Sequence, residues 1–278
     1  MTSEALVLVD DPCEGVRRLT LNRPEKRNAL SNLLRGELFA RLREADLDRS
    51  VRVVVIRGAG SCFSAGYDLG EDTRKNMPRH SPPADGAWPR HLVEGWFELM
   101  DYATPIIAQV HGWCLAGGTE LAAACDLVYT AEDAQFGYPP VRIISPPDMV
   151  WHPWLMGMRR AMEAMLTGDS MSGTEAVAAG IANRAFPADT LEEQVLAQAA
   201  RIAQIPGELL AMNKRVVHRS MEMMGMRNAM RANTETQALG MHQKHTREYY
   251  AKLAADLKGA FSERDKPFGD YRESEAKA

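Results

Sequence analysis

The sequence predicts an α/β fold. Three observations support this prediction: β-rich and helical segments alternate from residue 6 to residue 130, the β-rich segments are short apolar runs, and the C-terminal third has a helical pattern. The chain has 278 residues, of which 45% are hydrophobic. A chain of this length buries about 75% of the surface that it exposes when unfolded, so a large core is available.

The N-terminal segment predicts a β-hairpin. Residues 6–9 and 16–21 are rich in β-forming side chains, and the turn-forming segment 10–15 separates them. Ser31 can cap a helix that extends to about Asp46, in which apolar side chains recur with a nearly helical period. The almost uninterrupted apolar run 51–56 then predicts a buried strand. The fold therefore opens with a strand, a helix and a second strand.

The same order of elements recurs in the next segment. A helix is expected over residues 91–102, because Thr104-Pro105 ends it, and a strand follows over 106–110. Gly117 and Gly118 precede a small-residue helix at 119–125, and residues 127–130 predict another strand. This repetition is what favours an α/β core.

The chain after residue 141 predicts helices, with turns at Gly168, Gly180 and Pro206. These helices are expected over residues 159–166, 174–179, 191–203 and 208–224. We predict a core formed by residues 1–200 and a helical region formed by residues 201–278, as two parts of one packed unit. The proline-rich segment 72–89 is expected to be a mobile surface loop.

Composition and charge exclude several classes of protein. The net charge is −4 and the isoelectric point is near 6.0, so no basic field is present to attract nucleic acid or an anionic membrane. Mean hydropathy is −0.31, and no apolar run is long enough to span a membrane. The four cysteines have no CxxC spacing, and no His, Cys and carboxylate pattern suggests a metal site. A soluble, cytoplasmic protein without a metal is expected.

Two glycine-containing turns follow predicted strands. One is Ser64-Ala65-Gly66-Tyr67-Asp68-Leu69, and the other begins at Ala116-Gly117-Gly118 and leads into a helix. Small residues allow a ligand to approach main-chain N–H groups, and a helix N-terminus favours negative charge. Each turn alone is typical of an ordinary tight turn, whereas the pair favours an oxyanion hole.

Three longer motifs contain or precede these turns, and they carry a family resemblance. Residues 21–30 (LNRPEKRNAL), 63–69 (FSAGYDL) and 111–122 (HGWCLAGGTELA) resemble the crotonase superfamily of enoyl-CoA hydratases and isomerases. The similarity continues in order to residues 261–268. The resemblance implies a crotonase-like spiral of ββα units with a helical C-terminal trimerisation region. It also implies a homotrimer or a hexamer built from two trimers, an acyl-CoA thioester substrate, and no cofactor besides the coenzyme A of that substrate.

The resemblance assigns a role to residues in both turns. The backbone N–H groups of Tyr67 and Gly117 would form the oxyanion hole, which holds the thioester oxygen as an enolate develops. Glu120 would act as a general acid/base, since burial can raise a carboxyl pKa towards neutrality. Without the resemblance, a glutamate favourably placed in the first turn of a helix is the better explanation of Glu120.

The sequence departs from the family pattern at Pro140, which occupies the position of the second hydratase glutamate. A proline side chain can neither donate nor accept a proton. Asp148 resembles an aspartate used by the dienoyl-CoA isomerases of the family, and it could form the second acid/base group. It could also be a loop aspartate that accepts backbone N–H bonds. His152 is expected to be packed or surface-exposed rather than catalytic. Its neighbours Trp151 and Trp154 fit either the wall of an acyl pocket or the core.

The remaining candidates concern substrate binding and assembly. Lys26, Arg27 and Lys266 could contact the phosphates of coenzyme A. The resemblance also places substrate contacts at Ala29, Ala65, Asp68, Leu69 and Gly118. The methionine-rich segment 221–230 is expected to pack among the C-terminal helices or in a trimer contact rather than to form a flexible ligand surface.

We therefore predict an enoyl-CoA hydratase-like enzyme that stabilises a thioester enolate and uses Glu120 as acid/base. One alternative is an enoyl- or dienoyl-CoA isomerase that uses Glu120 with Asp148. A second alternative is a non-catalytic acyl-CoA-binding or assembly subunit. The sequence leaves the acyl group, the pathway, and the choice between trimer and hexamer open.

Overall fold

A six-stranded sheet forms the centre of the molecule. In the computed structural model, which describes residues 5–81 and 84–271, its strand order is β1-β2-β3-β4-β6-β9. β1 and β2 form the predicted antiparallel hairpin, and every other neighbouring pair is parallel. The α/β prediction is thus confirmed. The strand bounds are β1 Val7–Cys13, β2 Val16–Leu21, β3 Val53–Gly58, β4 Ile106–Val110, β6 Leu127–Ala131 and β9 Arg184–Phe186.

A smaller sheet lies beyond the end of β4. It contains β5 (Trp113–Leu115), β7 (Gln135–Gly137) and β8 (Met171–Ser172), in the order β5-β7-β8. The sequence analysis missed these strands, because two or three residues are too few for a period of two to be visible. A bridge between Ser64 and Cys114 joins the start of this sheet to the turn after β3.

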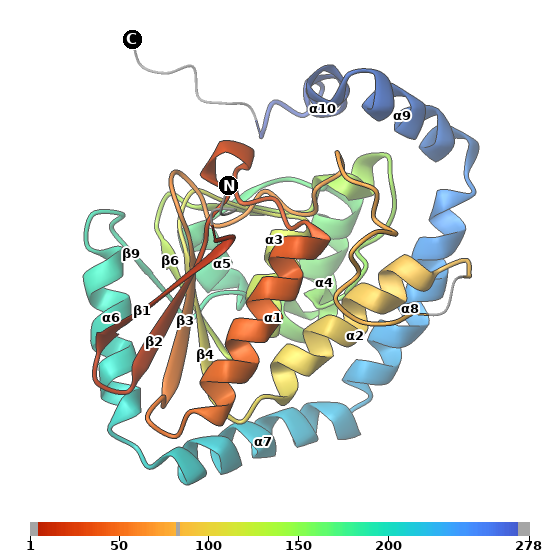
Figure 1. Cartoon of the computed structure of the whole chain (residues 1–278). Coiled ribbons are helices and arrows are strands. Elements are labelled where there is room, and N and C mark those ends of the chain that lie inside the picture. Colours follow the sequence, from red (N-terminus) through yellow and green to blue (C-terminus); the bar gives the residue numbers. More distant parts are fainter. Residues whose placement is uncertain (1–4, 82–83, 272–278) are drawn as a thin grey trace.

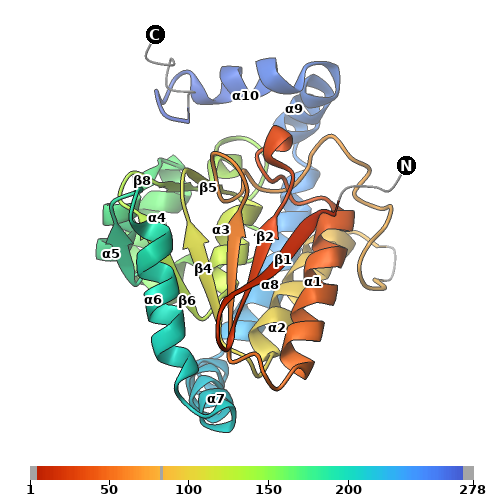
Figure 2. The same ribbon diagram turned by 60° about the vertical axis from the view of Figure 1, so that its left-hand side comes forward.

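Helices cover both faces of the large sheet, as Figures 1 and 2 show. α6 (Leu191–Ala203) packs on β3, β4 and β6, whereas α1 (Asn32–Leu47) packs beside β1 and β2 on the opposite face. α2 (Ala87–Asp101) and α3 (Gly117–Ala124) pack against each other on the same side as α1. These helices enclose the apolar strands, which is why the strands show continuous apolar runs.

α1 illustrates how the sequence determines an element. The side chain of Ser31 accepts a hydrogen bond from the Leu34 N–H at 3.1 Å, as predicted for its N-cap. Leu34, Leu38 and Leu42 recur at helical spacing and are fully buried. The predicted helix 31–46 therefore agrees with the observed α1 to within one residue at each end.

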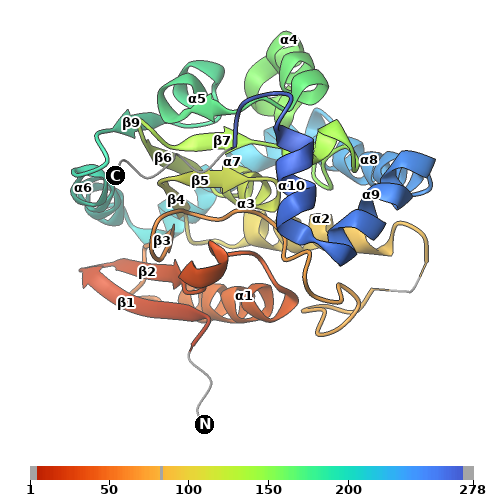
Figure 3. The same ribbon diagram turned by 90° about the horizontal axis from the view of Figure 1, so that it is seen from above.

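The C-terminal third is helical, as predicted. α8 packs against α2, while α9 and α10 extend across the end of the sheet where the short helix η1 (Pro24–Lys26) lies (Figures 1 and 3). The remaining helical bounds are η2 Pro139–Arg142, α4 His152–Thr167, α5 Gly173–Ala179, α7 Gly207–Met223, α8 Met226–Met241, α9 Lys244–Ala255 and α10 Leu257–Asp265.

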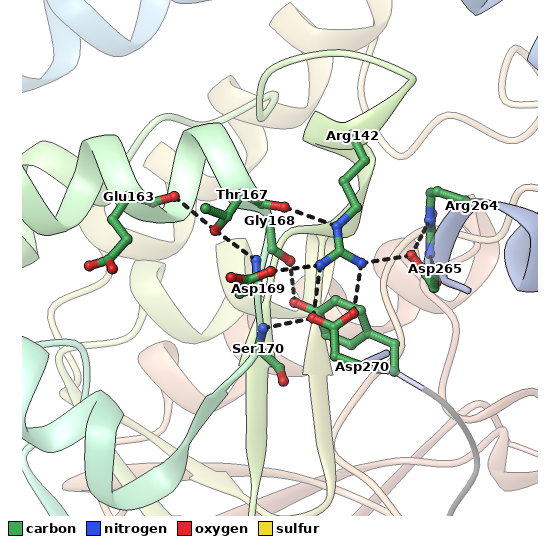
Figure 4. A network of polar contacts seen from close by, with 10 residues as sticks. Arg142, Glu163, Thr167, Gly168, Asp169, Ser170, Arg264, Asp265 and Asp270 are labelled. Atoms are coloured by element: carbon green, nitrogen blue, oxygen red, sulfur yellow. Dashed lines mark hydrogen bonds and ion pairs between the residues drawn. The ribbon is translucent and has the colours of Figure 1, made fainter. Parts of the chain in front are cut away.

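The last described residues, 265–271, form a segment that we call the C-terminal strap. Arg142 of η2 lies beneath it with its side chain 2% exposed, and it pairs with Asp265 at 3.0 Å and Asp270 at 2.8 Å (Figure 4). The same guanidinium pairs with Asp169 at 3.0 Å, and Tyr271 Oη donates to the Gly168 carbonyl at 2.7 Å. The strap therefore fixes the end of α10 to the turn that follows α4.

The segment between β3 and α2 is irregular, but the loop predicted over residues 72–89 is too long at its end, because α2 begins at Ala87 and includes Pro89. Residues 82–83 of the predicted loop lie outside the described residues. Across residues 5–81 and 84–271, no helix combines the length and the apolar character needed to cross a membrane.

Candidate active site

A large cleft lies between the turns that follow the strands of the large sheet and the helices α9 and α10. It encloses about 1990 Å³, and its walls come from segments spread from residue 25 to residue 271. The cleft brings together many of the residues that the sequence analysis singled out. Those that line it are Lys26, Arg27, Ala29, Ala65, Tyr67, Asp68, Leu69, Pro140, Asp148 and Lys266.

The two glycine turns meet at the inner part of this cleft. Gly66 has a φ of 102° and Ala116 a φ of 47°, both in the region that L side chains rarely adopt. A Cβ atom built on Gly66 would lie 3.2 Å from the Gly117 nitrogen and 2.9 Å from the Leu115 carbonyl oxygen. The turn that contains Tyr67 is therefore packed directly against the start of α3, and only glycine permits this approach.

The N–H groups of Tyr67 and Gly117 lie in these neighbouring turns. Neither N–H donates to an acceptor in the part of the chain that the structure describes. Gly117 is the first residue of α3, so its N–H also lies at the positive end of the helix dipole. Two free donors at such a position suit an oxygen that gains negative charge.

The side chain of Tyr67 explains the glycine at position 117. A Cβ atom on Gly117 would lie 2.7 Å from the Tyr67 ring, closer than real Cβ contacts. The ring therefore lies against the Gly117 backbone, while its hydroxyl reaches the carboxylate of Glu120. The sequence analysis assigned a role only to the backbone of Tyr67.

Glu120 accepts hydrogen bonds on both carboxylate oxygens. Oε2 accepts from the Tyr67 hydroxyl and from Trp96 Nε1, the latter at 3.3 Å. Oε1 accepts from the Tyr138 hydroxyl at 3.1 Å and from the Met149 N–H at 3.1 Å. Trp96 Nε1 also lies 3.0 Å from the Tyr67 hydroxyl. We call this group of side chains the Glu120 cluster.

Burial governs the acid/base properties of the Glu120 cluster. Glu120 is 0% exposed, and burial raises its carboxyl pKa although the hydrogen bonds from Tyr67, Met149 and Tyr138 oppose the change. Burial and the Glu120 charge raise the pKa values of the Tyr67 and Tyr138 hydroxyls. Both tyrosines line the cleft, whereas Glu120 does not. The phenols therefore stand between this carboxyl group and the cleft.

Asp148 is the carboxyl group at the inner wall of the cleft. It is 5% exposed, and its Oδ1 has no hydrogen-bond partner among residues 5–81 and 84–271. Its N–H donates to the Tyr138 hydroxyl at 3.4 Å. Burial and the nearby charge of Glu120 raise the pKa of Asp148 well above its usual range, so this side chain can carry a proton.

Arg35 supplies a buried positive charge beside these acids. Its Nη1 donates to Asn32 Oδ1 at 3.0 Å, and its guanidinium lies 5.6 Å from the centre of the Trp96 ring. Burial lowers its pKa to about 10, while the charges of Tyr67, Glu120 and Asp148 act in the opposite direction. Nothing in the sequence distinguished Arg35 from an ordinary charged residue of α1, because function here depends on contacts made only in the fold.

The structure also shows which aromatic residues belong to the core and which line the cleft. His152 stacks on Trp151 with ring centroids 3.8 Å apart, and burial lowers the His152 pKa to about 3. Trp151 is part of the core and Trp154 packs against it, so neither one walls the cleft. Trp88 and Trp113 line the cleft instead. The core interpretation of Trp151 and Trp154 is therefore confirmed.

Two of the residues predicted to contact the substrate, Asp68 and Gly118, make close contacts within the protein itself. Asp68 pairs with Arg23 at 2.9 Å; burial alone would raise the pKa of Asp68, but hydrogen bonds from Arg23 and the Gly70 N–H lower it. Gly118 does not line the cleft, and a Cβ there would lie 2.6 Å from the Ser64 carbonyl oxygen. Their contact with substrate stays a prediction.

In the described part of the chain, six positive side chains line the cleft, together with acidic ones. The positive side chains are Lys26, Arg27, Arg74, Lys258, Arg264 and Lys266. Arg27 also lies over the ring of Trp113 at 4.5 Å, which orients its guanidinium. Within the described ranges, no three His, Cys, Asp or Glu side chains form a group that could hold a metal ion.

The chain is similar to proteins of one family. The family model described as enoyl-CoA hydratase/isomerase matches residues 12–268. The "Probable enoyl-CoA hydratase echA8" of Mycobacterium bovis is 33% identical over 80% of this chain and 84% of that protein. A "Probable enoyl-CoA hydratase" of Rhizobium meliloti is 35% identical over 74% of this chain and 78% of that protein.

Solved structures agree with the sequence comparison. An enoyl-CoA hydratase/isomerase from Xanthobacter autotrophicus Py2 superposes with a TM-score of 0.86 and 32% identity, covering 95% of this chain and 99% of that one. An enoyl-CoA hydratase from Mycobacterium smegmatis superposes with a TM-score of 0.87 and 29% identity, covering 96% of each chain. The cleft and its two glycine turns therefore belong to a fold found in these proteins.

Proposed function

The chain belongs to the enoyl-CoA hydratase/isomerase family of enzymes, and from this premise we propose that it is a hydratase-like enzyme acting on an acyl-CoA thioester. The thioester carbonyl oxygen would accept hydrogen bonds from the N–H groups of Tyr67 and Gly117. The observation that carries the proposal is the direct packing of these two turns, which leaves both donors without a protein acceptor across the described residues.

These donors favour chemistry at the carbons next to the thioester. Negative charge moves onto the carbonyl oxygen when an enolate forms, and pre-oriented donors stabilise that charge more than they stabilise the ground state. In a hydration, water adds its hydroxyl group to the β-carbon of an enoyl thioester, and the α-carbon of the enolate receives a proton. Glu120 and Asp148 are the carboxyl groups to which we assign this proton transfer.

The position of Asp148 supports a second candidate function, the isomerisation of an enoyl or dienoyl thioester. Pro140 lines the cleft at the position of the second hydratase glutamate, so the usual pair of glutamates is absent from this site. Asp148 lines the same cleft, and its raised pKa allows it to donate a proton at one carbon while Glu120 receives one from another. Hydration and isomerisation share the enolate and differ in whether water adds.

The outer part of the cleft suits the coenzyme A moiety. Lys26, Arg27 and Lys266 line it and would pair with phosphate groups. We further propose that no separate cofactor is needed, because coenzyme A arrives with the substrate. Turnover should be unchanged after treatment with a chelator.

The test is to incubate the protein with a panel of enoyl-, dienoyl- and 3-hydroxyacyl-CoA esters in isotopically labelled water. Incorporation of solvent oxygen into product identifies hydration. Deuterium at carbon without solvent oxygen identifies isomerisation or enolisation. Tight binding of the esters with neither label incorporated would contradict the enzymatic proposal and favour a non-catalytic acyl-CoA-binding subunit.

A further inference from the structure

Glu120 is separated from the space that a substrate can occupy. It is fully buried and absent from the cleft wall, whereas Tyr67 and Tyr138 line the cleft and donate hydrogen bonds to its two oxygens. Met149 N–H and Trp96 Nε1 also donate to this carboxylate. A proton from the acyl group therefore has no direct route to Glu120 in this arrangement.

Tyr67 provides an indirect route. Its N–H lies in the proposed oxyanion hole, its ring lies against Gly117, and its hydroxyl is bonded to Glu120. Building on the proposed function, we propose that the Tyr67 hydroxyl transfers the proton between the acyl α-carbon and Glu120. One residue then contributes a main-chain donor to the carbonyl oxygen and a side-chain proton to the neighbouring carbon.

The proposed transfer is balanced in both directions. In the direction of enolate formation, the bond between the α-carbon and its hydrogen breaks, and the proton moves to the Tyr67 oxygen. The hydroxyl proton of Tyr67 moves at the same time to Glu120 Oε2, and the electron pair of the broken bond enters the thioester enolate. In the reverse direction the phenol protonates the α-carbon and regains a proton from Glu120. No oxidant or further reactant is required.

The surroundings of the Tyr67 hydroxyl fit this role better than those of Tyr138. Trp96 Nε1 lies 3.0 Å from the Tyr67 oxygen and can stabilise negative charge on it during transfer. The Tyr138 oxygen instead accepts a hydrogen bond from the backbone N–H of Asp148 at 3.4 Å, and no indole N–H contacts it among the described residues. Burial and the Glu120 charge raise the Tyr67 pKa, so the phenol keeps its proton in the resting protein.

The experiment compares Tyr67→Phe with the wild type, using whichever ester of the panel the wild type turns over fastest. The substitution retains the ring and the main-chain N–H but removes the hydroxyl. We expect kcat and the rate of deuterium exchange at the α-carbon to fall on the order of 100-fold or more, with little change in KM. Tyr102→Phe is the matched control, because Tyr102 also donates to a glutamate, Glu98, at 2.9 Å but lies outside the cleft.

Two further variants separate a proton-transferring phenol from a ring that only covers Glu120. The double variant Tyr67→Phe with Glu120→Gln should lose no more activity than either single variant, because both changes interrupt one route. Tyr67→Ala, which opens a path to Glu120, should also be impaired. Wild-type exchange in folded Tyr67→Phe, or near-normal turnover in Tyr67→Ala, would overturn the inference while leaving the enzymatic function intact. A wild type that transforms no ester would overturn both.

Discussion

At the scale of single residues, Glu120 and Asp148 are two buried carboxyl groups with different surroundings. Glu120 is held by four donors, whereas Asp148 has an oxygen without a partner in the described part of the chain. Burial raises the pKa of both groups. This difference allows their contributions to be measured separately.

We expect Glu120→Gln to abolish proton exchange at the α-carbon, because the substitution removes the carboxyl group to which we assign the proton. If Asp148 is the second acid/base group, Asp148→Asn should also cost on the order of 100-fold or more in kcat. Steady-state kinetics on the purified variants gives both values. Unchanged turnover in Asp148→Asn would restrict the acid/base role to Glu120, and unchanged turnover in Glu120→Gln would make Glu120 a structural residue.

The raised pKa of Asp148 also predicts a pH-dependent stability. Because burial and the Glu120 charge raise this pKa in the folded protein, the group favours folding most at a pH below its unfolded pKa of about 4, and this contribution disappears as pH rises through the folded pKa. Asparagine does not titrate. The Tm of Asp148→Asn minus that of wild type should therefore increase from pH 4 to pH 8 in thermal melts. A difference that stays constant over this range would show that Asp148 does not titrate abnormally.

Gly117→Ala should disturb the Glu120 cluster without a large effect on folding. The added Cβ would meet the Tyr67 ring at 2.7 Å, so the ring must move and its hydroxyl must leave Glu120. We expect kcat to fall at least 10-fold, within the range for loss of an aligned acid/base group. Gly36→Ala is the control, because the nearest atom to its Cβ lies at 3.7 Å. Normal turnover in Gly117→Ala would mean that the position of the Tyr67 ring is unimportant.

The sequence predicted the parts of the site that depend on backbone geometry. The turns at Tyr67 and Gly117 were found because glycine at a strand end has a specific conformational meaning. Trp96 and Arg35 were missed because each lies in a helix, where it resembles an ordinary core or surface residue. Their contribution depends on the distance to Glu120, which involves three separate segments of the chain and has no signature in any one of them.

At the scale of elements, the quality of the prediction followed the length and regularity of each segment. α6 was predicted with its exact bounds, 191–203, because its apolar positions recur without interruption. α4 was predicted only from residue 159, since Gly157 has a φ of 70° and breaks the helical pattern near its start. α8, α9 and α10 were expected only as part of a helical region, without individual bounds.

The role of the C-terminal strap in anchoring α10 can be tested by mutation. Arg142→Gln would leave the carboxylate of Asp270 without its cation and Asp265 with Arg264 alone. Removal of one partner from a buried ion pair typically costs about 3–5 kcal/mol. We expect a lower Tm and faster hydrogen exchange in α10, because the strap is its anchor to the turn after α4. Arg247→Gln, at an exposed position of α9, is the control. Equal protection of α10 in Arg142→Gln and wild type would contradict this role for the strap.

At the scale of the whole molecule, α7 has an exposed apolar face. Its exposed apolar side chains are Leu209, Met212, Val216, Val217 and Met223, and Met223 is 89% exposed. Met224, which caps the C-terminus of α7, is also exposed. A second group lies on α4, at Leu155, Met158, Met162 and Leu166. Extended apolar surfaces of this kind are typical of contacts between proteins.

We therefore expect the protein to associate with further copies of itself, as the sequence analysis predicted, with a mass that is a multiple of three protomers. Val217→Glu should shift the mass measured by light scattering towards that of the monomer, because it places a charge in the apolar face. Leu33→Glu, at an exposed apolar position of α1, should leave the mass unchanged. A monomer at all concentrations of the wild type would contradict the expectation.

The arrangement around Arg142 also has a consequence for synthesis on the ribosome. Asp169, Asp265 and Asp270 all follow Arg142 in the sequence, and two of them belong to the strap. A nascent chain emerges from its N-terminus, so the large sheet, whose last strand is β9, can form while Asp265 and Asp270 are still untranslated. The cleft wall that contains Phe261 and Lys266 is likewise missing until translation is almost complete. A ribosome stalled before residue 257 would therefore carry a chain with its two glycine turns in place but without the finished cleft.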